Sequence, residues 1–527
     1  MLLLYFSRKA HIITSKFSIA KNIIWLSLPV LVTNVMQSLV QIIDTIMVGR
    51  IGPQQIAAIG LGNTLRMFVF ILVMSVAAGS MSLVAQAKGG RDSKKISFIS
   101  RQSLSSGLIV SILLGIIGIM LSYPALSLME QGGSENVVNM AYSYLIIVFL
   151  GTPFLLLNFV VERLMQGAGD MKTPLYLNAV TIVFNILLNY VLIFGVGAIP
   201  AMGLNGAALG TVLARGLSFA VGMYILYSGK NVIKILPGSY KPDWLMFKDI
   251  FAIGLPSGLQ GVLRRGANLL LIGLITATEL GTFGAAALAI GWQIEQLLIQ
   301  PIVGLNVSST AMIGHALGRW QVKDAIMKGN ILMVTGVILS IIFVIPVLIY
   351  TEEIIIFFDP SAHPQVMSGA VGFFKITMLS LPFAAISVVI TGIMRGTGDT
   401  KPAMYSTLVF RNIITVGLGF LFAFQMDMGA IGIWWAMVIG RFLDCIVMLI
   451  VWIRKKWIKT AISFTEIFRT HLIGLSDQNL NQYLKKVRAP LMAVAGTKEV
   501  IDESGVTYMN DKGNTRVEFM TGNYILK

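Results

Sequence analysis

The chain has 527 residues, of which 56% are hydrophobic and 12% charged, and its mean hydropathy is +0.80. Soluble domains are about 45–50% apolar and about 25% charged, so this composition excludes an ordinary soluble protein and indicates a protein of the lipid bilayer. The net charge of +16 is spread over alternate loops, as described below, so we expect no nucleic-acid partner.

Apolar segments of about 20 residues, enough to cross a hydrocarbon core about 30 Å thick, recur as far as Trp452. We therefore predict an all-α polytopic membrane protein with twelve transmembrane helices. The spans lie near residues 23–47, 56–82, 103–123, 140–163, 176–198, 204–228, 248–274, 284–310, 329–350, 370–394, 406–425 and 430–453.

The loops between these spans differ in charge. Loops after even-numbered spans are basic, for example Lys88 and Arg91 after span two, and both ends of the chain are basic too. Loops after odd-numbered spans have almost no basic residue beyond Arg50 and carry acids such as Glu279 and Asp427 instead. Cytoplasmic loops carry the excess of Lys and Arg. We therefore predict a multi-pass protein of the cell (inner or plasma) membrane with both termini cytoplasmic, which requires an even number of spans.

The two halves of the chain resemble each other when one is shifted by about 229 residues. The clearest match sets Gln166-Gly167-Ala168-Gly169-Asp170 against Arg395-Gly396-Thr397-Gly398-Asp399, each followed by a lysine and a proline. Because six spans are an even number, the repeats are parallel and related by a pseudo-two-fold axis along the membrane normal. A central cavity between two six-helix bundles follows, which suits alternating access.

This repeat divides the chain into five parts. The predicted parts are a cytoplasmic N-terminal segment (1–22), a first six-helix bundle (23–228), a cytoplasmic linker (229–247), a second six-helix bundle (248–457) and a cytoplasmic tail (458–527). The start of the chain has no small-residue cleavage site, so we expect no removable signal peptide.

Span one carries a polar stripe. Asn34, Gln37, Gln41 and Asp44 are spaced three, four and three residues apart, which places them on one helical face. A charged group at the bilayer centre costs about 2.5–3.5 kcal/mol on insertion scales, so we expect Asp44 to face a cavity or a partner and to be an ion-coupling residue. The alternative is that Asp44, six residues before Arg50, is solvated at the outer surface. The other three residues are predicted to line a substrate cavity.

Asparagines in neighbouring spans are candidate partners of this acid. Span five holds Asn185 and Asn189 one turn apart, and span four holds Asn158. Their amides can hydrogen-bond to Asp44 and respond to its protonation. The alternative for each is interhelical packing, worth about 0.6 kcal/mol.

Span seven, the repeat of span one, carries a different stripe. At an offset near 227, Gln37 corresponds to Arg264, Gln41 to Asn268 and Asp44 to Leu271. With Gln260, the stripe holds an arginine and two amides but no acid, and we expect it to line the cavity. Glu295 in span eight is the nearest counter-charge in the sequence, and we expect it to pair with Arg264 or Arg66 across the central interface, either structurally or for coupling.

The chain shows no sign of catalytic or cofactor chemistry. His315 and His363 lack companions at metal-ligand spacing, and no phosphate-binding P-loop occurs. We therefore expect no enzyme activity, no cofactor and no metal site, and an ion gradient as the energy source.

Taken together, several of these motifs resemble the multidrug and toxic compound extrusion (MATE) transporters over residues 20–455. The resemblance rests on the end of span one, from Asp44-Thr45 to Gly49-Arg50-Ile51-Gly52, on the two Gly-x-Gly-Asp loops and on Gln293-Ile294-Glu295. It implies export of organic cations or other amphipathic compounds by antiport with protons or sodium. In proton-coupled members the residue resembling Asp44 works with asparagines, and the position resembling Asn189 can be an aspartate.

Two departures from the family pattern bear on coupling. Asn189 is an amide here, which leaves the first half with one certain carboxylate. Many sodium-coupled relatives have a glutamate near the position of Arg264, so its absence argues against that sodium site. The leading hypothesis is a monomeric, proton-coupled exporter of small organic cations. The alternatives are a lipid-linked precursor flippase of the same superfamily and, because of Arg264 and Arg265, an exporter of organic anions.

Overall fold

The computed structural model describes residues 2–129, 135–229, 231–358, 363–458 and 460, and four short strands near the C-terminus. The strands pair antiparallel, β1 (Asn510–Asp511) with β2 (Asn514–Thr515) and β3 (Phe519–Thr521) with β4 (Tyr524–Leu526). Almost all of the predicted tail beyond Ile458 lies outside the described residues, whereas most of the chain before it is helical.

Seven helices cover the first half of the chain. They are α1 (Leu2–Gly49), α2 (Pro53–Gly89), α3 (Ser93–Met129), α4 (Glu135–Leu150), α5 (Thr152–Gly167), α6 (Lys172–Phe194) and α7 (Gly203–Ser228). Helices α4 and α5 meet at an angle of 50°, because Pro153 just after Gly151 has no N–H to continue the ladder of hydrogen bonds. These two helices together occupy the predicted fourth span.

The second half repeats this order with more interruptions. Its elements are α8 (Trp244–Thr276), α9 (Gly281–Gly318), α10 (Val322–Ile349), α11 (Thr351–Phe358), α12 (Pro364–Thr377), the 3-10 turn η1 (Met378–Ser380), α13 (Leu381–Thr397), α14 (Lys401–Ser406), the π-helix η2 (Thr407–Ile414), α15 (Thr415–Phe420), the π-helix η3 (Leu421–Gln425) and α16 (Gly429–Ile453). The predicted tenth span runs from α12 to α13, and the predicted eleventh from α14 to η3.

The helices account for the predicted spans in order. Among the described residues, nine helical segments are long and apolar enough to cross a membrane, and the bent pair of α4 and α5 makes a tenth. The remaining places, spans two and seven, are taken by α2 and α8, which carry Arg66 and the Arg264–Arg265 pair within their lengths. Most of the helices are longer than the apolar runs from which the spans were predicted.

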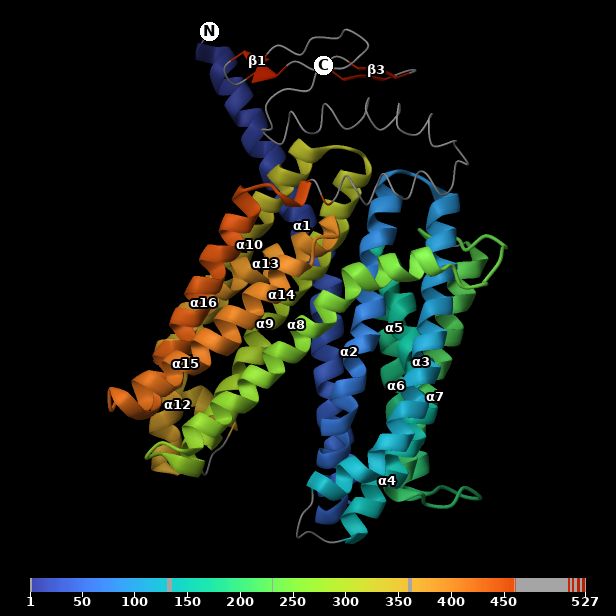
Figure 1. Cartoon of the computed structure of the whole chain (residues 1–527), viewed down its shortest axis with the longest axis vertical. Coiled ribbons are helices and arrows are strands. Elements are labelled where there is room, and N and C mark those ends of the chain that lie inside the picture. Colours follow the sequence, from blue (N-terminus) through green and yellow to red (C-terminus); the bar gives the residue numbers. More distant parts are fainter. Residues whose placement is uncertain are drawn as a thin grey trace.

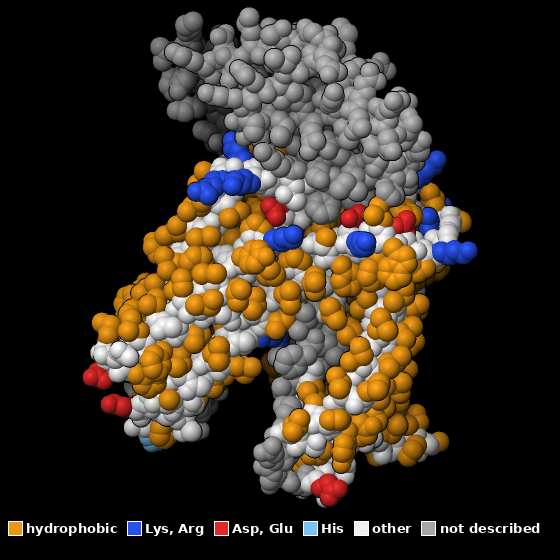
Figure 2. Space-filling view, viewed as in Figure 1, with side chains coloured by type: hydrophobic (Ala, Val, Ile, Leu, Met, Phe, Trp, Pro, Cys, Tyr) orange, Lys and Arg blue, Asp and Glu red, His pale blue; other side chains and the backbone are white. Residues whose placement is uncertain are grey.

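The two bundles form a V. They meet at the end that holds the N-terminus of α1 and diverge toward the opposite end (Figure 1). On the face shown in Figure 2, Lys and Arg side chains gather at the closed end, together with some acidic ones, whereas the charged side chains at the tips of the two arms are acidic. We call these the basic end and the acidic end. A hollow separates the arms on this face and opens at the acidic end (Figure 2).

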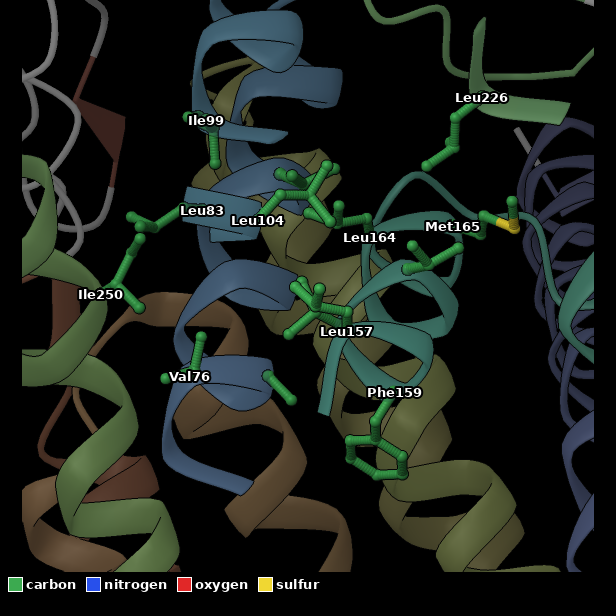
Figure 3. Close-up of a cluster of buried hydrophobic side chains, with 14 of the residues drawn as sticks. Val76, Leu83, Ile99, Leu104, Leu157, Phe159, Leu164, Met165, Leu226 and Ile250 are labelled. Atoms are coloured by element: carbon green, nitrogen blue, oxygen red, sulfur yellow. The ribbon is translucent and has the colours of Figure 1, made fainter. Parts of the chain in front are cut away.

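The first helix of each half crosses from one bundle to the other. In α8, Ile250 and Ile253 are buried in the core of the first bundle, whereas Leu271 and Ile275 are buried in the core of the second. Figure 3 shows Ile250 beside Val76 and Leu83 of α2. The reverse holds for α1, whose Ile23 is buried in the second bundle and whose Val48 is buried in the first.

Small residues allow the bundles to approach closely at these crossings. A Cβ atom on Gly254 of α8 would lie 1.9 Å from the carbonyl oxygen of Ser75 in α2, so only glycine fits. At the equivalent crossing, Ser27 of α1 donates a hydrogen bond of 2.9 Å to Ser308 of α9. Small residues and hydroxyl hydrogen bonds are the usual means of helix association in membranes, and here they close the basic end.

The outer surface of the bundles is apolar. On α3, for example, Leu113, Ile116, Ile117 and Met120 are between 50% and 71% exposed. A helix with its large apolar side chains facing outward is stable only against lipid or a partner. The all-α, membrane-spanning fold class predicted from the sequence is therefore confirmed.

Candidate functional site

The polar stripes of α1 and α8 lie where each helix passes between the bundles. In α8, Arg264 falls between Ile253, in the first core, and Leu271, in the second. Its repeat partner in α1, Gln37, falls between Ile23 and Val48 in the same way. Both stripes are therefore near the point from which the two arms of the V diverge, a position typical of transporter substrate sites.

Asp44 is held by the first bundle. Asn189 of α6 donates a hydrogen bond of 2.8 Å from Nδ2 to Oδ1 of Asp44. The same Nδ2 lies 3.5 Å from Oδ1 of Asn185, and Asn185 donates a bond of 3.2 Å to the hydroxyl of Thr211 in α7. Three of the four predicted coupling residues therefore form a continuous chain of polar groups from α1 to α7.

A second bond joins α1 to α6 two turns away. Gln37 donates from Nε2 to Oδ1 of Asn178 at 2.6 Å, and Asn178 in turn donates to the carbonyl of Pro174 at 2.9 Å. The Nδ2 of Asn34 is buried and has no hydrogen-bond partner among the described residues. Gln41 belongs to α1, but its side chain lies outside the described residues.

The fourth predicted coupling residue, Asn158, leads to an acid that the sequence analysis missed. Asn158 donates a hydrogen bond of 2.9 Å to Oε1 of Glu162, one turn along α5, and Asn178 lies close to this carboxylate. Glu162 is only 3% exposed and has no ion pair within the described part of the chain. The inference that the first half holds one certain carboxylate is therefore wrong. The spacing of Asn158 and Glu162 within an apolar span was the available signal.

The predicted partner of Glu295 is also wrong. Its carboxylate pairs with Arg441 of α16, whose NH2 lies 2.7 Å from Oε1 and 2.9 Å from Oε2. Arg441 also donates a bond of 3.0 Å to Ser380 in η1. The pair is buried within the second bundle, where the 3-10 interruption of the tenth span brings a hydroxyl to the guanidinium. Neither Arg264 nor Arg66 forms a salt bridge within the described residues.

The stripe of α8 divides its side chains between two environments. Gln260 is buried and donates to the carbonyl of Ala403 at 3.1 Å and to the hydroxyl of Thr407 at 3.0 Å, so it ties α8 to the eleventh span. The Nε of Arg264 is buried without a hydrogen-bond partner among the described residues. Asn268, one turn further, is partly buried. Gln260 thus packs within the bundle, whereas the guanidinium of Arg264 is left available to bind another group.

Metal-ligand chemistry finds no support in the part of the chain that the structure describes, which brings no three His, Cys, Asp or Glu side chains into a possible metal site. His315 lies in α9, and its Nε2 is 2.9 Å from the carbonyl of Gly167 in α5. This contact joins the two bundles at the basic end, so it accounts for His315 by packing.

Comparison with known proteins places this arrangement in a family. The MatE family model matches residues 29–191 and 267–421, one segment in each half. A probable multidrug resistance protein NorM of Thermotoga maritima is 27% identical over 464 residues, covering 84% of this chain and 94% of that protein. A probable multidrug resistance protein YoeA of Bacillus subtilis is 26% identical over 430 residues, covering 80% of this chain and 90% of that protein.

Solved structures show the same fold. One, described as the outward-facing conformation of a multidrug resistance MATE family transporter of the MOP superfamily, has a TM-score of 0.75 at 23% identity and covers 84% of this chain and 96% of its own. Another, a MOP superfamily transporter from Pyrococcus furiosus described as having a binding pocket of reversed polarity, has a TM-score of 0.74 at 24% identity, with coverage of 82% and 95%. The predicted fold of twelve helices in two bundles is confirmed.

Proposed function

The chain belongs to the MatE family of membrane transporters, and on that premise we propose that it exports small amphipathic organic compounds, organic cations among them, by antiport with protons. It is a transporter and not an enzyme. The names of its relatives, which are multidrug resistance proteins, support a broad range of substrates. The adaptable apolar lining that such a range needs is compatible with a chain that holds 28 Met and 28 Phe residues.

The bond between Asp44 and Asn189 is the observation that carries this proposal. It puts a titratable carboxylate on α1, a helix that packs in both bundles. It also puts an amide on α6 whose hydrogen bond depends on the charge of this carboxylate. Protonation of the carboxylate removes its charge and leaves Asn189 with a weaker acceptor. Proton binding to Asp44 therefore acts directly on the position of α1.

Glu162 supplies a second carboxylate in the same bundle. Asn178 touches both Glu162 and Gln37 of α1, so this acid also connects to α1 through an amide. An ionised carboxylate that has amide donors but no ion pair is costly in a low-dielectric interior. We infer that Glu162 is protonated for part of the cycle and contributes to coupling.

The second bundle favours protons over sodium as the coupling ion. Sodium needs several oxygen ligands, and the two acids near Arg264 are already engaged, Glu295 by Arg441 and Asp444 by the hydroxyl of Ser406. Arg264 and Leu271 stand where span one has Gln37 and Asp44. Near this stripe, the described residues therefore offer the ion no free carboxylate.

The shape and charge of the molecule support an orientation. The basic end, where the chain begins, fits the cytoplasmic side by the positive-inside rule, so we place both termini in the cytoplasm of a cell that carries the protein in its inner or plasma membrane. The V then opens outward (Figure 2). Because both acids and their amide partners come from one chain, a monomer suffices for the cycle.

The test is transport in reconstituted liposomes. Efflux of a fluorescent organic cation is measured under a proton gradient alone and a sodium gradient alone, for wild type and Asp44→Asn. We expect the proton gradient to drive transport in wild type and to fail in the variant. The matched control is Asp427→Asn, because Asp427 is exposed in a loop with a left-handed backbone (φ 51°) that asparagine tolerates. Equal proton-driven transport in wild type and Asp44→Asn would contradict the role of Asp44.

A further inference from the structure

The second bundle contains an excess of positive charge within its predicted membrane spans. Four arginines share one electrostatic cluster with two acids, and the formal charge of this cluster is about +2 if all six are ionised. The arginines are Arg264 and Arg265 of α8, Arg411 of η2 and Arg441 of α16, and the acids are Glu295 of α9 and Asp444 of α16. A membrane interior tolerates such charges only when they are paired or functional.

The two acids leave most of the arginines without a partner. Glu295 receives both contacts from Arg441, and Asp444 accepts a hydrogen bond from Ser406. Arg264 and Arg411 make no salt bridge within the described residues, and the Nε of Arg264 is buried without a hydrogen bond there. A buried donor left unsatisfied costs free energy, so an anion that accepts a hydrogen bond from Arg264 is favoured there. Arg411 adds a second guanidinium that has no salt bridge within the described residues.

The backbone brings together the two segments that carry these arginines. Arg411 lies in η2, an eight-residue π-helix, and π-helical turns inside helices are often found at functional sites. Helix α8 packs against η2, and the bonds from Gln260 to Ala403 and Thr407 fix the start of this contact one turn before Arg264. Further along, Asn412 approaches Gly266, whose Cβ position would be 4.0 Å from its Oδ1.

Placement between the bundles makes the pair accessible to a substrate. Arg264 lies on the part of α8 between the two hydrophobic cores, Arg265 beside it is exposed, and Arg264 and Arg411 are each partly exposed. Basic side chains are visible in the hollow between the arms (Figure 2). Apolar residues such as Leu271 follow on the same helix. The lining therefore combines guanidinium groups with apolar surface.

We propose that Arg264 and Arg411 form a binding site for the carboxylate group of an amphipathic organic acid, which the protein carries as a substrate. A guanidinium fork matches the two oxygens of a carboxylate and forms strong, charge-assisted hydrogen bonds. The inference rests on the proposed function, since it names a substrate class for the same transport cycle. It assigns substrate recognition to the second bundle and leaves proton coupling with the first.

The test is equilibrium binding to the purified full chain in phosphatidylcholine nanodiscs, measured by calorimetry. The probes are 2-naphthoate, its neutral analogue 2-naphthamide and the cation 2-naphthylmethylammonium. We expect naphthoate to bind at least tenfold more tightly than the amide. Arg264→Gln and Arg411→Gln should each weaken naphthoate binding by about tenfold to a hundredfold. Equal binding of naphthoate and naphthamide to wild type would overturn the proposal without any variant.

Further variants separate charge, shape and location. Arg264→Lys keeps the charge but loses the fork, so naphthoate binding should fall between that of wild type and Arg264→Gln. The matched control is Arg454→Gln, because Arg454 is exposed after α16 and its loss should leave binding unchanged. Full naphthoate affinity in both Arg264→Gln and Arg411→Gln would place the anion elsewhere and overturn the assignment.

Two more experiments distinguish other sources of naphthoate binding. In nanodiscs that contain phosphatidylglycerol, naphthoate should still bind; its complete displacement would assign the site to a lipid headgroup and overturn the proposal. Asp44→Asn should keep naphthoate binding, and its loss would show that the site is not confined to the second bundle. If wild type binds naphthoate but shows no proton-driven transport, the proposed coupling fails while the anion site stands.

Discussion

Asn189 donates a hydrogen bond of 2.8 Å to Asp44, 145 positions earlier in the chain. The bond joins α6, a helix of the first bundle, to α1, whose beginning packs in the second bundle and whose end packs in the first. A change at this carboxylate therefore acts on a helix that both bundles hold. Such a helix can transmit proton binding to the angle between the two arms.

Replacing Asn189 by leucine should impair proton-driven efflux. The variant removes the hydrogen-bond donor to Asp44, and a hydrogen bond to a charged group is worth about 1.5–3 kcal/mol. We expect the coupled rate to fall by roughly tenfold to a hundredfold in proteoliposomes. Asn139→Leu is the matched control, because Asn139 is exposed on α4. Normal rates of proton-driven efflux in both variants would show that coupling does not need Asn189.

Replacing Glu162 by glutamine should lower the number of protons exchanged per substrate. Glutamine keeps the shape and can still bond to Asn158 and Asn178, but it cannot take up a proton. For a gradient of one pH unit, each coupled proton contributes about tenfold to the accumulation ratio, so the ratio at equilibrium should fall by about this factor. Glu279→Gln, at an exposed position, is the control. An unchanged ratio would show that Glu162 is structural.

Breaking the pair between Glu295 and Arg441 should destabilise the second bundle. Glu295→Gln leaves a buried guanidinium without its carboxylate, which costs about 3–5 kcal/mol, and thermal unfolding in detergent should shift to lower temperature. Exchanging the two charges, Glu295→Arg with Arg441→Glu, should recover part of the loss. The same exchange between Glu295 and Arg264 should not. Recovery only in the second exchange would favour the pairing expected from the sequence.

Adding one carbon to Gly254 should loosen the basic end. In Gly254→Ala the Cβ would lie 1.9 Å from the carbonyl oxygen of Ser75, and overpacking of this kind costs about 1–3 kcal/mol. The open population should therefore rise by roughly fivefold to a hundredfold. Gly273→Ala is the control in the same helix, because nothing lies within 4 Å of its Cβ position.

Thiol labelling reports this opening. The natural Cys445 is first replaced by alanine, and Ala85→Cys is introduced, because Ala85 is buried against Gly314 at the basic end. A membrane-impermeant maleimide should then react faster in everted vesicles when Gly254→Ala is present. Labelling at the same rate as with Gly273→Ala would mean that α2 and α8 do not seal this end.

The sequence by itself determined the fold class and its symmetry. Apolar run lengths, loop charge and the repeat of Gln166–Asp170 in Arg395–Asp399 are local or periodic signals, and the bilayer makes them strong because only helices of fixed length satisfy their backbone there. Helical spacing also predicted the polar face of span one with Asp44, and of the three asparagines expected beside this acid, Asn189 makes the hydrogen bond.

Only the tertiary structure decided which side chains meet. Glu295 was matched to the wrong arginine because nothing along the chain shows that η1 and α16 bring Ser380 and Arg441 to it. Glu162 was overlooked because the sequence of an apolar span with one acid does not show whether amides or lipid surround that side chain. A buried charge is stabilised by partners from distant helices. Packing sets the distances between the charge and these partners, and sequence periodicity carries no information about packing.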